Sequence, residues 1–65
     1  MCLSTVYLLG KEGQREMVAD CITGVVVDGL FVTVTDIMGS STVLEGIIKS
    51  VDLVGNTLEV EGKHA

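Results

Sequence analysis

The middle of the chain carries the clearest alternation of apolar and polar positions. Between Leu30 and Thr35 one set of apolar residues recurs at every second position, which is the period of a β-strand. This segment follows Val25–Val27 across Asp28-Gly29, a dipeptide that supplies the positive φ angles of a type I′ turn. The pattern therefore predicts a β-hairpin at the centre of the chain.

A second hairpin is predicted near the end, where residues 47–54 and 57–62 flank Gly55-Asn56. Apolar residues again alternate with polar ones, and several of the polar ones are acidic. We expect the acidic side chains to face water and the apolar side chains to face the core. The predicted inward set consists of Val51, Leu53, Leu58 and Val60.

The remaining segments are short and separated by glycine-containing turns. Residues 3–9 form a predicted strand, and residues 14–19 form its hairpin return, although their propensities also fit a helix. Residues 20–24 predict a bulge or bend, and a short strand over 42–44 is expected to break at Glu45-Gly46. Six or seven short antiparallel strands without a convincing helix indicate a small all-β barrel forming a single domain over residues 1–65.

The size of the chain affects how this barrel becomes stable. A domain of 65 residues buries little apolar surface, so without disulfides it normally needs a metal ion or a partner subunit. Nearly half of the residues, 48%, are nevertheless apolar. We therefore predict a homodimer, because two-fold dimers are the commonest oligomers.

Charge and segment composition exclude several classes of function. Nine acidic residues against four basic ones give a net charge of −5, whereas nucleic-acid binding depends on clustered Lys and Arg. The sequence contains no apolar run long enough to span a membrane and no signal-peptide pattern. We expect no binding to nucleic acid or membranes, and a cytoplasmic location in which cysteines stay reduced.

The candidate chemistry lies at the start of the chain, in Met1-Cys2-Leu3. Removal of Met1 would give Cys2 a free α-amine and a thiol, and these two groups can close a five-membered chelate ring on a metal ion. A deprotonated amide nitrogen of Leu3 can add a third donor. Nitrogen donors with a thiolate in one plane suit Ni(II) or Cu(II). The alternative is that Cys2 is a small residue packed under the first strand.

The other residues that could bind a metal or take part in catalysis do not form a predicted site. Cys21 is expected in the core, because free cysteine is among the most buried residue types, although a disulfide with Cys2 on oxidation stays open. Met17 and Met38 are also expected in the core, and His64 is expected to be solvated near the end of a polar tail. Neither a nucleophile–histidine–acid set nor a carboxylate dyad can be assembled, so the sequence does not predict an enzyme.

Taken together, these features resemble the CooT family of carbon monoxide dehydrogenase accessory proteins. The resemblance is carried by Met1-Cys2, the strand over residues 3–9, the Asp28-Gly29 hairpin, Glu45-Gly46-Ile47 and the closing Val51-Asp52-Leu53. It implies a small and commonly dimeric β-barrel that binds Ni(II) through Cys2 and handles nickel for carbon monoxide dehydrogenase. Bound nickel would occur once per monomer, or once per dimer if the two N-termini meet.

Two other functions are suggested by related small proteins. The hydrogenase maturation chaperones of the HypC type also begin with Met-Cys and carry a small β-barrel, and would use the cysteine to contact a client protein. They usually have a proline shortly after that cysteine, whereas this chain contains no proline. Some members of the CooT family are labelled as RNA-binding, but the acidic composition does not support that function.

Overall fold

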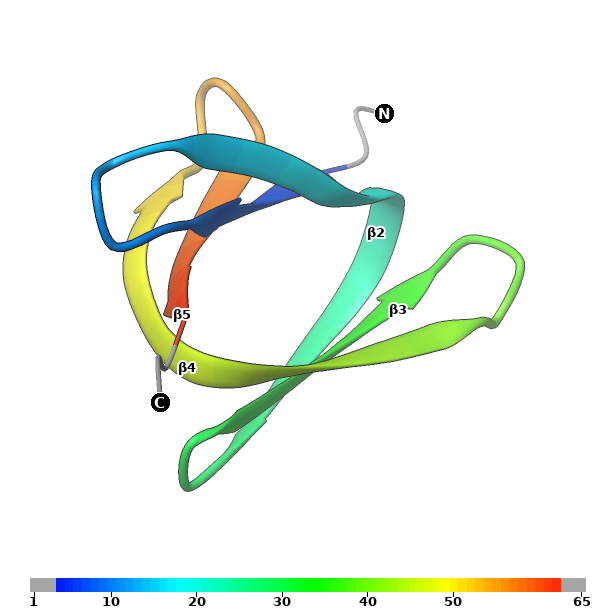
Figure 1. Cartoon of the computed structure of the whole chain (residues 1–65). Coiled ribbons are helices and arrows are strands. Elements are labelled where there is room, and N and C mark those ends of the chain that lie inside the picture. The colour runs from blue at the N-terminus through cyan, green and yellow to red at the C-terminus, as the bar shows by residue number, and fades with distance from the viewer. Residues whose placement is uncertain (1–3, 63–65) are drawn as a thin grey trace.

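The computed structural model describes residues 4–62, which form five β-strands and no helix (Figure 1). Because the described residues contain no helix, they contain none that could cross a membrane. Two of the strands are long and three are short. The strands are β1 (Ser4–Leu9), β2 (Arg15–Asp28), β3 (Phe31–Asp36), β4 (Ser41–Asp52) and β5 (Thr57–Gly62).

The strands pair in the order β1-β2-β3-β4-β5 and close into a barrel. Neighbours along the chain pair antiparallel, and the barrel closes through a parallel pairing of β1 with β5, from Thr5↔Thr57 to Leu9↔Glu61. The predicted all-β barrel is confirmed. The segment 14–19, for which a helix was the alternative, is the first part of β2.

The described residues contain five strands where six or seven were expected, because two expected breaks lie inside continuous strands. β2 runs through Gly24 and β4 runs through Gly46. At each place the strand exchanges one neighbour for another: β2 leaves β1 for β3, and β4 leaves β3 for β5. A glycine permits this bend without ending the strand, since it has no Cβ to obstruct a close backbone.

The central hairpin also differs from its predicted turn type. Asp28 pairs with Phe31, so the two-residue loop is Gly29-Leu30 and not Asp28-Gly29. Gly29 has a φ of 60°, whereas Leu30 is not among the described residues with positive φ. Glycine at the first loop position followed by a residue of negative φ is typical of a type II′ turn.

The last hairpin is formed as predicted, but only half of its expected inward set is buried. Leu58 and Val60 are in the core, whereas Val51 is 56% exposed and Leu53 is 83% exposed. Val51 is in register with the buried Leu58 and so shares its face, but it lies one residue before the end of β4 and stays exposed. Leu53 lies beyond the end of β4, in the turn.

Six side chains form the buried core, and they come from four of the five strands. Leu44 and Ile48 of β4 pack against this cluster while staying partly exposed. Met17 and Met38 were expected in the core but are 57% and 85% exposed. The core consists of Val6, Ile22, Val32, Val34, Leu58 and Val60.

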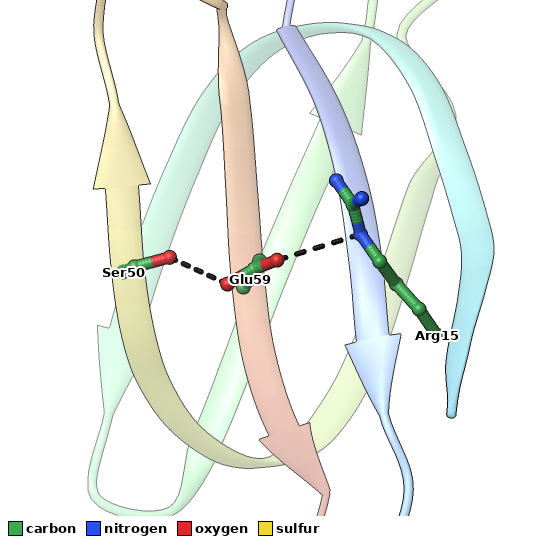
Figure 2. A network of polar contacts seen from close by, with 3 residues as sticks. All are labelled: Arg15, Ser50 and Glu59. Atoms are coloured by element: carbon green, nitrogen blue, oxygen red, sulfur yellow. Dashed lines mark hydrogen bonds and ion pairs between the residues drawn. The ribbon is translucent and has the colours of Figure 1, made fainter. Parts of the chain in front are cut away.

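A polar network on the outside of the barrel crosses the closing pair of strands (Figure 2). The Glu59 carboxylate accepts a hydrogen bond of 2.8 Å from the Ser50 hydroxyl and forms a 3.4 Å ion pair with Nε of Arg15. The Arg15 guanidinium lies 3.8 Å from the centre of the Tyr7 ring, a cation–π distance. Because these residues come from β4, β5, β2 and β1, the network connects four strands over the parallel closure.

Candidate functional site

The predicted nickel ligands Cys2 and Leu3 lie outside the described residues, and so does His64. The structure does describe the barrel end from which β1 begins. Ser4 pairs with Ile22 of β2. The amide of Thr5 donates a 2.9 Å hydrogen bond to the carbonyl of Asn56, which precedes β5. The first described residues are thus held between β2 and β5.

A hollow of about 200 Å³ opens at this end of the barrel. Its floor includes the core side chains of Val6, Ile22 and Leu58, and Ser4 is part of its wall. The lining is more apolar than polar, with Thr23, Asp52 and Thr57 as further polar members. The hollow is completed by Gly24, Val25, Val51 and Leu53.

The carboxylates at this end already have backbone partners. Oδ1 of Asp52 accepts hydrogen bonds from the amides of Val54 at 3.0 Å and Gly55 at 2.9 Å, which shapes the turn before β5. Oδ1 of Asp20 accepts from the amide of Cys21 at 2.8 Å and from the hydroxyl of Thr5 at 3.2 Å. Asp52 therefore shapes the turn before β5, and Asp20 fixes the irregular part of β2 beside the start of β1.

Cys21 is half-buried and is not a member of the core. It lies in the expected bulge, where the register of β1 against β2 shifts between Ser4 and Val6 and Cys21 has a φ of 55°. A left-handed residue interrupts the alternation of side chains along a strand. The neighbouring Ile22, at 6% exposure, occupies the core position instead.

Residues 4–62 do not supply a metal centre of their own. No group of three or more His, Cys, Asp and Glu side chains within this range could hold an ion. Sequence reasoning identified the start of β1 but gave no signal for the adjoining hollow, since its walls come from segments up to about fifty residues apart and meet only when β1 closes on β5.

Comparisons with known proteins agree with this architecture. A crystal structure of a protein described as a CooT from Carboxydothermus hydrogenoformans superposes with a TM-score of 0.84 over 97% of this chain and 100% of that chain. Its sequence identity is 16%, so it establishes the shared fold. No curated protein matched the sequence.

The family comparison confirms the resemblance found in the sequence. The model described as CO dehydrogenase accessory protein CooT matches residues 1–61, so the match includes Cys2 as well as all but the last residue of the five strands. An accessory protein serves another enzyme's assembly, which agrees with the lack of a predicted catalytic set. The chain belongs to the CooT family of carbon monoxide dehydrogenase accessory proteins and is not itself an enzyme.

Proposed function

We propose that this protein is a cytoplasmic nickel carrier that binds Ni(II) as cargo at Cys2 for the maturation of carbon monoxide dehydrogenase. The observation that carries the proposal is the family match, which begins at residue 1 and so includes Cys2. The ligands would be the thiolate and α-amine of Cys2, after removal of Met1, and the amide nitrogen of Leu3. This donor set has the nitrogen and sulfur character that Ni(II) prefers in a planar site.

The position of Ser4 supports a site at one end of the barrel. Cys2 precedes Ser4 by two residues in the sequence. Ser4 itself is held by β2 and lines the hollow. No group of three or more metal-binding side chains forms within residues 4–62, so the described end of the barrel offers no competing metal site.

The proposed chemistry makes binding depend on pH. The α-amine has an ordinary pKa of about 8 and the thiol of about 8.5, and both groups, like the amide nitrogen of Leu3, must lose a proton to bind the metal. Affinity therefore rises with pH, most steeply below pH 8, where the amine and the thiol are still protonated in the free protein. A site formed by one terminal residue and one amide also leaves the metal accessible to the ligands of a client enzyme.

We further propose that the protein is a homodimer. Thirteen large apolar side chains of the described residues are exposed, against six buried ones. Such a small core favours association, as is common for domains of this size. If the two N-termini share one ion, titration ends at one nickel per dimer; if each holds its own, it ends at one per monomer.

The test is a nickel titration of untagged protein, monitored by thiolate-to-metal absorption and by native mass spectrometry. Mass spectrometry also reports whether Met1 has been removed. The variant Cys2→Ser should lose the absorption band and the bound metal. Cys21→Ser is the matched control, because it removes the other thiol of the chain and should bind as the wild type does. Unchanged binding by Cys2→Ser would refute the assignment.

A further inference from the structure

Parts of β2, β3 and β4 form an open three-stranded sheet. Gly24–Asp28 of β2 and Ser41–Glu45 of β4 both pair with β3. Within residues 4–62 no strand continues the sheet beyond either segment, because the ladder with β1 ends at Ile22 and the ladder with β5 begins at Gly46. Figure 1 shows this part of β2 leading into a hairpin that projects from the barrel.

The outer face of this sheet exposes large apolar side chains. Val32 of β3 belongs to the core, so its neighbours Phe31 and Thr33 lie on the opposite face. Thr33 is in register with Val26 of β2 and with Val43 of β4, and residues in register share a face. Phe31, Val26 and Val43 are 51%, 64% and 61% exposed. An apolar surface therefore extends over all three strands.

Carboxylates flank the aromatic residue of this face on both sides. Phe31 is in register with Asp28 on β2 and with Glu45 on β4. Side chains directly opposite each other in antiparallel strands have Cβ atoms about 4.5–5.5 Å apart. The ring thus lies in one row between two acidic side chains, beside the row that contains the two valines. We call these two rows the acidic platform, which consists of Val26, Asp28, Phe31, Thr33, Val43 and Glu45.

Asp28 differs from the other aspartates of the described residues. Asp20, Asp36 and Asp52 accept hydrogen bonds from backbone amides and so shape turns or a bulge. The exposed side chain of Asp28 forms no hydrogen bond or ion pair with residues 4–62. A ligand of the platform would therefore displace no existing partner of this carboxylate.

The charge around the platform selects the kind of partner. All four basic residues of the chain lie outside residues 16–48, whereas this range contains Glu16, Asp20, Asp28, Asp36 and Glu45. Two platforms placed face to face would bring four carboxylates together, and opposed like charges disfavour an interface. The complementary occupant is a positively charged segment that also offers an apolar side chain.

We propose that the acidic platform docks a basic segment of carbon monoxide dehydrogenase, with an Arg or Lys side chain over Phe31 and between Asp28 and Glu45. A cation within about 6 Å of a ring centre is attracted to its face, and arginine can also donate to the flanking carboxylates. Its aliphatic stem, or an apolar neighbour, would cover Val26 and Val43. This inference rests on the proposed function and names the surface that meets the client.

The test measures binding to purified nickel-free carbon monoxide dehydrogenase by isothermal titration calorimetry. The double variant Asp28→Asn/Glu45→Gln should weaken binding roughly 10-fold or more. Phe31→Leu should weaken it about 3–10-fold, because it keeps an apolar side chain but loses the aromatic face. Glu12→Gln/Glu16→Gln is the matched control: it makes the same change of net charge at exposed positions near the β1–β2 turn, and should bind as the wild type does.

Salt dependence and a single substitution complete the test. Wild-type affinity should fall as salt is raised from about 0.05 to 0.3 M, and the affinity of the double variant should fall less. Because Glu45 also interacts with another residue of the chain, Asp28→Asn is measured alone as well and should bind more weakly than the wild type. Circular dichroism establishes that each variant is folded. Undiminished binding by Asp28→Asn and Phe31→Leu, or an equal loss in the control, would overturn the proposal.

Oligomeric state and nickel binding are measured on the same variants. The platform variants should sediment as the wild type does and bind the same amount of nickel. If Phe31→Leu dissociates a wild-type dimer, a second copy covers the platform and the proposal is overturned. A wild type that binds nickel at Cys2 but does not bind the enzyme would overturn the platform alone. A protein that docks through the platform but binds no nickel would overturn the metal site alone.

Discussion

Gly46 is the position at which the closure of the barrel is most sensitive to one added methyl group. A Cβ placed on Gly46 would overlap the carbonyl oxygen of Glu61, and would lie 3.0 Å from its carbonyl carbon and 3.1 Å from Cα of Gly62. All three atoms belong to the backbone of β5, so no change of side-chain rotamer can relieve the overlap. Gly46→Ala must therefore push β4 and β5 apart.

The expected loss of stability follows from these contacts. Overpacking of this kind costs about 1–3 kcal/mol. Separation of the strands also weakens the ladder at Gly46↔Gly62 and the 2.7 Å hydrogen bond from the Gly46 amide to the carbonyl of Leu30, at about 1 kcal/mol for each bond lost. Alanine offsets about 0.4–1 kcal/mol by restricting the unfolded chain. We expect a net loss of about 3 kcal/mol, a large part of the roughly 3–10 kcal/mol that stabilises a domain of this length.

The assay is urea denaturation followed by far-ultraviolet circular dichroism, since the chain contains no tryptophan. Gly24→Ala is the matched control: Gly24 also lies in a long strand, but an added Cβ there meets nothing within 4 Å and its φ is not in the left-handed region. The control should unfold at or slightly above the wild-type midpoint. If Gly46→Ala unfolds within about 0.5 kcal/mol of the wild type, or if both variants lose equal stability, the reasoning from close strand approach is wrong.

Three further predictions test the core, the closing network and the metal site. Val60→Ala should lose about 2 kcal/mol, because this side chain is fully buried, whereas Val43→Ala on the surface should change the unfolding midpoint little. Glu59→Gln should lose about 0.5–1 kcal/mol, since it removes the ion pair with Arg15 and leaves an amide that can still accept from Ser50; a loss that persists undiminished in 1 M salt would contradict an ionic origin. Nickel affinity, measured by competition with a chelator, should rise by up to about 1,000-fold per pH unit below pH 7, because the amine, the thiol and the amide each release a proton, and a pH-independent affinity would exclude this donor set.

The sequence by itself determined the class of fold and the candidate chemistry. Period-two alternation and glycine-containing turns are local signals, so they identified the central and final hairpins before any strand was placed in space. The candidate chemistry is also a local signal, because it depends only on Cys2 following Met1 directly in the sequence. The family match over residues 1–61 agrees with both, and the nickel ligands themselves stay a prediction.

Tertiary structure decided the features that depend on strand exchange. Gly24 and Gly46 were expected to end strands, yet they are the points at which long strands bend from one partner to the next. Glycine has the same local preferences whether a strand ends at it or bends through it. Contacts with other strands, such as the close approach of Glu61 to Gly46, are visible only in the folded structure. The exposure of Val51 is also a tertiary effect: it is in register with the buried Leu58, but it lies at the open end of the barrel, where it lines the hollow.

The candidate site shows the same division between local signals and features that depend on neighbouring strands. The sequence placed a candidate metal-binding group near the start of the first strand, but it could not show that this strand begins beside a hollow whose walls come from β2, β4 and β5. Nor could it show that Val25–Val27 form an edge, because whether a strand has one neighbour or two depends on where the rest of the barrel lies. Local chemistry is encoded residue by residue, whereas neighbours across a closed sheet are fixed only when the whole chain has folded.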